Sequence, residues 1–530
     1  MGMRTKLCVT AAVISLIAAL GHPRAQALLF FGQPYQPPPT YACPIVGGDV
    51  DVTTCGDVAT NYDTAAIQAA NDKVAAAGGG RVIFPPGAYQ GWGIRQDSNV
   101  AFVGRDGAAA TSITRAVDDT AVPLIEARTR ETYGTIAAGS STLTVRDATG
   151  VVPGALVAIR GAGAPSSSQR ITFPMGMSAS ASSAVVRDGK GLPLSGPNFV
   201  LIDNEIVSYK SIKNVLGTLI MSGLARGQMG TSATAHGDNA YGWQVARFYA
   251  QVVSVSGNTV MIDRPASRSV YDAATTVGAI RPSITGLTLQ GYRSSKASAP
   301  VVLYELTNQA SITDSVVRNG DQMGVRLSRG SRAALIANDV FEHNGYDAVS
   351  AGVWLFNGAS GNTIRNNTFN EDFAGIVADD RSYTATEWDA AANANRIEDN
   401  VIRVARTSGQ WDPNIGVLIE ASQDNVVARN EITGPAPGDM SVTGPWYGVY
   451  VQRNAQQGNV PSDAIRNDIT DNVIRKTQWG VVTSGSLNEY IGNLLEGAVD
   501  PVWDFGTSNY YESNVCTDAG GQPMDCGLPG

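Results

Sequence analysis

The chain has 530 residues, a formal net charge of −9 and only 16% charged residues. This acidic balance argues against nucleic acid as a partner, because nucleic acid is itself polyanionic. The 58 glycines and the many Asn-Gly, Gly-Asn and Asp-Gly steps favour short strands joined by turns over long helices. The composition therefore predicts a mostly β protein, built either from several domains or from one elongated repeat domain.

The first 27 residues, MGMRTKLCVTAAVISLIAALGHPRAQA, have the form of an export signal. Two basic residues precede an apolar run that ends at Leu20, and Ala25-Gln26-Ala27 fits the small-residue rule for cleavage. After this segment the sequence contains no run of about 18 apolar residues, so no membrane span is predicted. We therefore expect a mature protein that starts near Leu28, is secreted or periplasmic, and has no membrane span.

Residues 61–89, NYDTAAIQAANDKVAAAGGGRVIFPPGAY, predict a helix followed by a strand. Ala65, Ile67, Ala70 and Val74 have helical spacing, three glycines end the helix, and RVIF reads as a strand before a Pro-Pro-Gly turn. This stretch resembles the entry segment of the pectate-lyase-like superfamily, the pectin lyase-like fold. The resemblance implies a right-handed parallel β-helix solenoid whose open end is capped by the helix.

Residues 125–282 interrupt the solenoid pattern and include the Ser/Ala-rich run MSASASSAV. Within this region, FVLIDNEIVSYKSI and LARGQMGTSATAHGDNA resemble a small β module that recurs in phage-tail and β-helix proteins. The glycine-rich RGQMGT, residues 226–231, lacks the lysine and the spacing of a P-loop, so we interpret it as a turn. We therefore expect an inserted β-rich accessory domain.

The second half carries an internal repeat with asparagine at positions one and six and apolar residues at positions three and eight. Five copies are clear: NTIRNNTF (362–369), NRIEDNVI (395–402), NVVARNEI (425–432), NDITDNVI (467–474) and NEYIGNLL (488–495). Successive second asparagines, counted from Asn338, are 21 to 42 residues apart, which fits one coil with loops of variable length. Asparagine tolerates left-handed backbone, and its amide can bond the same amide one coil away. The repeat therefore predicts a structural asparagine ladder.

A second phrase follows each copy and predicts another parallel strand in every coil. The copies are GVRLS (324–328), GVWLF (352–356), GIVAD (375–379), GVLIE (416–420), GVYVQ (448–452) and GVVTS (480–484). Because side chains alternate along a strand, positions two and four of the phrase point inward, and positions three and five point outward. The predicted inward set is Val325, Leu327, Val353, Leu355, Ile376, Ala378, Val417, Ile419, Val449, Val451, Val481 and Thr483.

Four cysteines remain after the signal is removed, and they form two close pairs near the ends of the chain. Cys43 with Cys55 and Cys516 with Cys526 predict two local disulfides in an oxidising compartment. No histidine stands near either pair, which argues against a metal site. The expected organisation is a signal peptide (1–27), an N-terminal cap with the first coils (28–124), the inserted region (125–282), the β-helix repeats (283–515) and a disulfide-pinned tail (516–530).

Two outward acids, Asp379 and Glu420, occupy the same position of the second phrase in adjacent coils, and Asp380 follows the first directly. Parallel strands lie about 4.8 Å apart, so the two carboxyl groups are expected on the order of 5 Å from each other. At that distance joint ionisation is disfavoured, which separates an acid from a nucleophile. A separation of about 5–5.5 Å is also that of retaining glycosidases. The expected catalytic residues are therefore Asp379, Glu420 and Asp380.

Aromatic and polar side chains flank these acids on the same predicted face. Sugar rings present apolar surfaces to aromatic rings, and an arginine can bind an acid group of a substrate. The histidine of FEHNGYD is placed to act at the edge of a cleft. The expected substrate-binding residues are Trp354, Phe356, Tyr450, Arg326, Arg381, His343 and Gln452.

These features favour a carbohydrate-active enzyme that cleaves or transfers glycosidic bonds of a polysaccharide or oligosaccharide, without a cofactor or a metal. A second hypothesis is a polysaccharide lyase or uronate epimerase, in which Asp379, Asp380 and Glu420 would hold Ca²⁺. A third is a tailspike-like or adhesive solenoid that binds glycans without cutting them. Two structural alternatives also stay open: a solvated acidic pair, and aromatic residues packed beneath a long loop.

Overall fold

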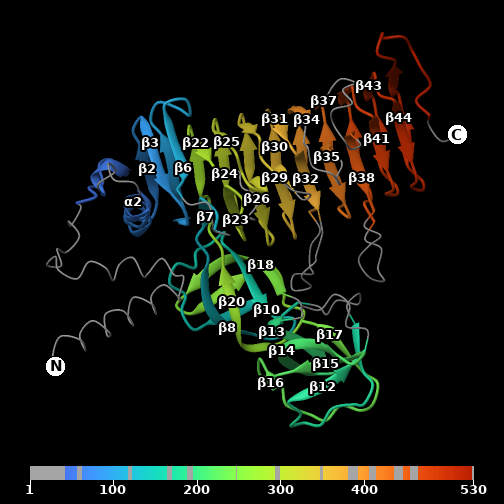
Figure 1. Cartoon of the computed structure of the whole chain (residues 1–530). Helices are drawn as coiled ribbons and strands as arrows, with labels where there is room; N and C mark the ends of the chain where they lie inside the picture. Colours follow the sequence, from blue (N-terminus) through green and yellow to red (C-terminus); the bar gives the residue numbers. More distant parts are fainter. Residues whose placement is uncertain are drawn as a thin grey trace, which may run out of the picture. The chain divides into compact units, whose positions relative to one another are not determined.

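The chain folds as a right-handed parallel β-helix with an inserted antiparallel β domain, which confirms the predicted fold class (Figure 1). In the computed structural model, the described residues are 42–56, 63–116, 122–163, 170–187, 195–245, 247–292, 299–345, 350–379, 392–404, 414–434, 446–453 and 463–527. The predicted export signal lies outside these ranges. Among the helices within them, none combines the length and the apolar character needed to cross a bilayer.

Three long parallel sheets form the walls of the solenoid. The first sheet contains β1 (Asp49–Asp51), β2 (Gly80–Phe84), β5 (Val100–Gly104), β21 (Ser283–Thr285), β24 (Ser311–Thr313), β27 (Leu335–Ala337), β30 (Thr363–Arg365), β33 (Arg396–Glu398), β36 (Val426–Ala428), β39 (Asp468–Thr470), β42 (Glu489–Ile491) and β45 (Tyr510–Glu512). The second sheet contains β3 (Gly87–Gly91), β6 (Thr111–Arg115), β22 (Thr288–Gln290), β25 (Val316–Arg318), β28 (Val340–Glu342), β31 (Thr368–Asp372), β34 (Val401–Val404), β37 (Glu431–Thr433), β40 (Val473–Arg475), β43 (Leu494–Glu496) and β46 (Val515–Thr517).

The third sheet is built from the second phrase of each repeat. It contains β4 (Ile94–Gln96), β7 (Ile125–Ala127), β23 (Val302–Glu305), β26 (Met323–Ser328), β29 (Ala351–Phe356), β32 (Ala374–Asp379), β35 (Asn414–Glu420), β38 (Trp446–Gln452), β41 (Trp479–Thr483) and β44 (Asp500–Asp504). The predicted inward residues of this sheet are buried, which confirms their assignment to the core.

Helix α2 (Thr64–Ala76) precedes the first complete coil and packs against β2 and β4, as predicted for a capping helix. A short 3-10 helix, η2 (Val52–Thr54), precedes it. Ile67, Ala70 and Val74 are buried as expected, but Ala66 is buried in place of Ala65, which is exposed. The helix ends before Gly78, whose φ of +94° is readily adopted by glycine.

Two asparagine ladders run along the repeats. In each, the side-chain Nδ2 donates to the Oδ1 of the asparagine one coil further, at 2.9–3.3 Å. The first ladder is Asn362, Asn395, Asn425, Asn467, Asn488 and Asn509, and the second is Asn367, Asn400, Asn430, Asn472, Asn493 and Asn514. The predicted ladder is therefore confirmed.

Two details of the ladder prediction are wrong. Asn338 is not a rung: Asp339 holds that position and donates its backbone N–H to Asn367 Oδ1 at 2.9 Å. The rungs also do not adopt left-handed backbone, because the residue before each rung makes the turn instead. These turn residues include Asn366, Asp399 and Arg429, with φ of +55°, +57° and +55°. The rung is thus freed to hydrogen-bond along the solenoid axis.

The glycine that opens each second phrase is required by close packing between coils. A Cβ added at Gly375 would lie 2.7 Å from the carbonyl oxygen of Gly416, and one at Gly416 would lie 2.6 Å from that of Gly448. No side chain fits there without displacing the neighbouring strand. The repeated glycine is therefore required by the close approach of neighbouring coils.

The inserted domain lies between β7 and β21 and consists of a closed barrel with a second sheet nested in its sequence (Figure 1). The barrel contains β8 (Arg130–Ile136), β9 (Thr142–Val145), β10 (Leu156–Arg160), β18 (Arg247–Ser256), β19 (Thr259–Ile262) and β20 (Val270–Val277). The nested sheet contains β11 (Arg170–Phe173), β12 (Ser183–Val186), β13 (Ser195–Ile202), β14 (Glu205–Val215), β15 (Thr218–Ser222), β16 (Ala225–Gln228) and β17 (Ala240–Gln244). Each has its own buried apolar core.

Both predicted disulfides are confirmed. Cys43 pairs with Cys55 before the capping helix, and Cys516 pairs with Cys526 at the last coil. Cys516 and Cys526 are buried with the apolar core of the solenoid. The tail between them folds back on β46 through a bridge from Thr517 to Pro523. The second disulfide therefore pins this tail over the last coil.

Candidate carboxylate site

The two predicted acids are neighbours in the third sheet. Asp379 ends β32 and Glu420 ends β35, and the two residues face each other in the parallel register of these strands. The same register pairs Phe356 with Asp379 and Glu420 with Gln452. Stacking of the second phrase thus brings together carboxylates that are 41 positions apart in the chain, as the sequence predicted.

Both carboxylates are buried, and here the expectation of an open surface is wrong. The exposed fraction is 0% for Asp379 and 4% for Glu420. The outer face of the third sheet holds an apolar cluster of its own, separate from the core inside the solenoid. Its buried members are Met323, Ala351, Trp354, Ala374, Val377, Ile415 and Leu418, with Phe356, Tyr447 and Tyr450 packed against them. Outward direction along a strand does not imply exposure to solvent.

The predicted aromatic residues lie on this face in the coils next to the acids. The rings of Trp354 and Phe356 meet edge to face, with centroids 5.3 Å apart. The guanidinium carbon of Arg326 lies 4.7 Å from the centroid of Phe356, which is a cation–π contact. One cation and two aromatic rings therefore border the carboxylate pair on its N-terminal side.

Two tyrosines border the pair on its C-terminal side. Tyr450 lies beside Leu418 in the strand register and stacks on Tyr447 with ring centroids 5.0 Å apart. Burial, with the negative charge of Glu420 and the phenol of Tyr447 adding to it, raises the pKa of Tyr450 to about 12. The Tyr450 hydroxyl thus stays protonated at physiological pH and can donate a hydrogen bond.

The aromatic stack extends beyond the predicted site residues. Tyr447 stacks on Trp479 at 4.9 Å, and Trp479 stacks on Trp503 at 5.4 Å. Tyr447 and Trp479 each stand directly before the glycine of a second phrase. Alignment of that preceding position would have revealed Tyr447 and Trp479, but not Trp503, which pairs with Val482 in the strand register.

The remaining predicted site residues are not all brought together. His343 lies in the turn after β28, in the second sheet, where its Nε2 is 3.1 Å from Glu371 Oε2, and both side chains are partly exposed. Gln452 ends β38 next to Glu420. Asp380 and Arg381 lie outside the described residues, so their predicted roles stay predictions.

A second buried charged cluster lies in the inserted domain. Glu205 accepts hydrogen bonds from Arg226 Nε and Nη2 at 2.8 and 2.7 Å, and its Oε2 is 2.9 Å from His236 Nε2. Burial would raise the pKa of Glu205, but these contacts and the amides of Thr234 and Gly227 outweigh it and lower the pKa to about 2. The interpretation of RGQMGT as a turn is right only in part: Arg226, Gly227 and Gln228 belong to strand β16, and Met229 and Gly230, both in positive φ, form the turn that follows.

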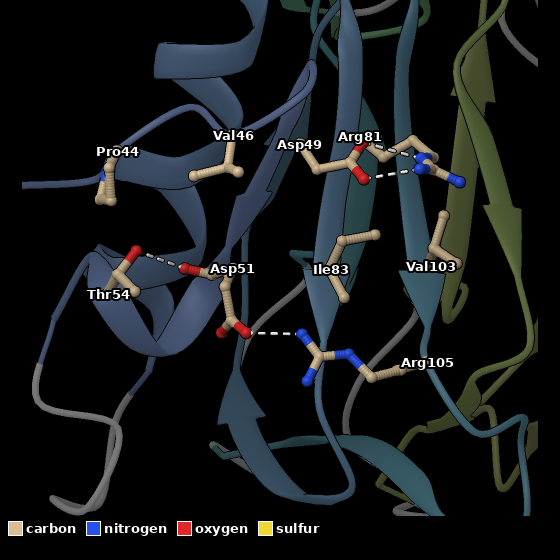
Figure 2. Close-up of a pocket in the computed structure, with 9 residues that line it drawn as sticks. All are labelled: Pro44, Val46, Asp49, Asp51, Thr54, Arg81, Ile83, Val103 and Arg105. Carbon is tan, nitrogen blue, oxygen red and sulfur yellow. Dashed lines mark hydrogen bonds and ion pairs between the residues drawn. The ribbon is translucent and has the colours of Figure 1, made fainter.

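A pocket of about 410 Å³ lies at the other end of the solenoid, on the first sheet (Figure 2). Asp49 pairs with Arg81 through two contacts of 2.7 and 2.5 Å, and Asp51 pairs with Arg105 at 2.7 Å. Figure 2 shows the four side chains directed toward one another in these two pairs. The charges of this pocket are therefore already matched within the protein.

The three stacked parallel sheets define the pectate-lyase-like class of right-handed β-helices. Residues 253–518, half of the chain, match the NosD family, which is described as periplasmic copper-binding protein, and the chain belongs to this family. No curated protein matches the chain closely enough to count as a relative.

Solved structures with similar folds are distant in sequence. The A-module of the mannuronan C-5 epimerase AlgE6 from Azotobacter vinelandii is 14% identical, with a TM-score of 0.42, and the match covers 88% of this chain and 99% of that one. The tailspike protein gp49 from Pseudomonas phage LKA1 is 13% identical, with a TM-score of 0.33 and coverage of 86% and 72%. The tailspike protein of E. coli bacteriophage HK620 is 10% identical, with a TM-score of 0.41 and coverage of 86% and 63%.

Proposed function

We propose that the chain is a secreted or periplasmic carbohydrate-active enzyme that cleaves or transfers glycosidic bonds with Asp379 and Glu420. The observation that carries the proposal is their register: two carboxylates end neighbouring strands of one sheet, between aromatic side chains. Strands about 4.8 Å apart match the carboxyl spacing of retaining enzymes, about 5–5.5 Å.

In this reaction one carboxyl group protonates the oxygen of the leaving sugar while the other attacks the anomeric carbon. The glycosidic bond breaks and a glycosyl ester forms on the attacking carboxylate. The first group, now ionised, then takes a proton from water or from an acceptor sugar, which displaces the ester. Trp354, Phe356 and Tyr450 would contact the apolar faces of the sugar rings. Because both carboxylates are buried, the face must open when a glycan binds.

The test is product formation from a panel of neutral and uronic-acid polysaccharides, read as new reducing ends and as ultraviolet absorbance. Asp379→Asn and Glu420→Gln should each lower kcat by at least about 100-fold, and the double variant should lose little more, because the two groups act as one unit. Asp399→Asn is the matched control. Asp399 lies in a turn of the solenoid and forms a partly exposed ion pair with Arg429. Full activity in both single variants would contradict the proposal.

A polysaccharide lyase or uronate epimerase is the second candidate, and Arg326 favours it. Its guanidinium group lies over Phe356 on the same face as the acids, where it would pair with the carboxylate of a uronic acid. A Ca²⁺ ion held by Asp379, Asp380 and Glu420 would assist by neutralising the same carboxylate. An unsaturated product that absorbs in the ultraviolet, lost on chelation, would select this candidate. Binding of the glycan without any product would select the adhesive solenoid.

The NosD family is described as copper-binding, but the described residues of this chain do not fit a copper site. Copper prefers imidazole and sulfur ligands. His236 and His343 each contact carboxylates, the four described cysteines form disulfides, and no group of three His, Cys, Asp or Glu side chains among the described residues is placed to hold a metal. Copper therefore has no part in the proposal.

A further inference from the structure

A second cavity lies in the inserted domain, where the barrel meets the nested sheet. It has a volume of about 610 Å³ and is lined by the end of β8, the start of β20, and two turns of the nested sheet around Asn204 and Gly230. The backbone N–H of Tyr271 donates to the carbonyl of Met229 at 3.0 Å, which joins the two parts beside the cavity. Its volume falls in the range of small-molecule sites, about 300–1,000 Å³.

Arg268 supplies a positive charge to this cavity. Its backbone is fixed by a hydrogen bond from its N–H to the carbonyl of Ala162 at 3.1 Å. Within the described part of the chain, no carboxylate forms an ion pair with its guanidinium group. Burial lowers the pKa of Arg268, and no charge partner offsets this effect.

The arginines in the pocket of Figure 2 differ from Arg268 in having carboxylate partners. There, Arg81 and Arg105 are neutralised by Asp49 and Asp51, so an added anion would have to displace a carboxylate. A half-buried guanidinium group that pairs with no carboxylate of the described residues has a desolvation cost that an anionic ligand can offset. The chain as a whole is acidic and therefore repels anions in general. An anion that binds at Arg268 must also make favourable contacts with the other residues of the cavity.

The other lining groups suit a sugar. Tyr271 is 66% exposed and lines the cavity, and the apolar face of a pyranose could stack on such a ring. Ser267, Asn204 and Ser269 add polar side chains for hydroxyl groups. A single arginine can bind one carboxylate through two parallel hydrogen bonds, and the cavity is much larger than an inorganic ion.

We propose that this cavity binds an acidic saccharide, with the uronate carboxylate on Arg268 and a sugar ring against Tyr271. The inserted domain would thereby hold an anionic polysaccharide at a site separate from the carboxylate pair. The proposal does not depend on the chemistry of Asp379 and Glu420, because it concerns only binding.

The test is calorimetric titration of the full chain carrying Asp379→Asn, so that the probe stays intact. The probe is a galacturonic acid tetramer, and a neutral glucose tetramer and inorganic phosphate are the comparison ligands. Arg268→Gln should weaken binding of the galacturonic acid tetramer at least tenfold. Arg264→Gln is the matched control, because Arg264 lies four residues away over the ring of Phe248 and does not line the cavity.

Tyr271→Ala removes an exposed ring without disturbing a core, and it should weaken the same binding several-fold. Urea midpoints equal to that of the parent chain would establish that the variants are folded. Unchanged affinity in Arg268→Gln would overturn the proposal. Equal affinity for the neutral tetramer, or for inorganic phosphate, would also overturn it, because the site would then not read an acidic sugar.

Discussion

Asp339 occupies a ladder position where the following coils have asparagine. Its Oδ1 accepts the backbone N–H of Ser315 at 2.8 Å, and the residue is 1% exposed. Burial, with a smaller contribution from the charge of Asp314, raises the pKa of Asp339 to about 8 against the opposing hydrogen bond from Ser315. A protonated carboxylic acid thus stands in for an amide at this rung.

The raised pKa makes stability depend on pH. Because the folded state holds the Asp339 proton more tightly than the unfolded state, the free energy of unfolding should fall as pH rises from about 4 to about 8. Asp339→Asn should remove that dependence and stabilise the protein by about 1–3 kcal/mol at pH 8.5. Urea unfolding at pH 5 and pH 8.5 measures both. An Asp339→Asn variant with the same pH dependence as the parent would refute this origin.

The site was predictable at the residue scale only in part. Strand alternation assigned Asp379 and Glu420 to one outward column, and coil stacking made them neighbours. Alternation gives the direction of a side chain but carries no information on what covers it, so the burial of both acids was not foreseen. Arg268 was missed for a different reason, since its cavity joins segments that no repeat or spacing relates.

At the scale of the repeated element, adjacent asparagines have opposite roles. Asn367 is a buried rung whose Nδ2 donates to Ile336 O and to Asn400 Oδ1, both at 3.0 Å. Its neighbour Asn366 is exposed and makes the left-handed turn with φ of +55°. The repeat showed that asparagine is needed, but only the backbone shows which of the two residues bonds along the axis.

This difference predicts unequal effects of two neighbouring substitutions. Asn367→Ala should destabilise the fold by at least about 2 kcal/mol, because it leaves buried polar groups of two neighbouring coils without their partner. Asn366→Gly should change stability by no more than about 0.5 kcal/mol, because glycine adopts positive φ freely. Thermal and urea unfolding of the two variants give the comparison. Similar losses in both would mean that the ladder is not the main source of the effect.

At the scale of the whole molecule, the inserted domain and the solenoid have separate cores. The barrel and the nested sheet each bury their own apolar side chains, and a small cluster of Leu156, Ala158 and Tyr249 with Leu306 joins the barrel to a solenoid coil. The sequence revealed the insertion through the loss of the repeat. It could not reveal the barrel, since antiparallel pairing of distant strands leaves no periodic signature.

Separate cores predict that residues 128–282 fold without the solenoid. The excised segment should give a cooperative unfolding transition and a dispersed NMR spectrum. Residues 283–420, which would expose the open ends of solenoid coils, should aggregate instead, because interior repeats need their neighbours or caps. A disordered 128–282 segment would show that the insertion depends on the solenoid for its structure.

The ladders also separate the alignment of the coils from the length of chain between them. Bonded rungs are 21 residues apart between Asn467 and Asn488, but 42 apart between Asn425 and Asn467, with the same amide geometry. Each rung aligns its coil with the next one regardless of the length of the loop between them. A connection can therefore become longer or shorter in evolution without shifting any other coil. New specificities can thus be sampled loop by loop on an unchanged frame, and a foreign loop grafted between two rungs should be accommodated in the same way.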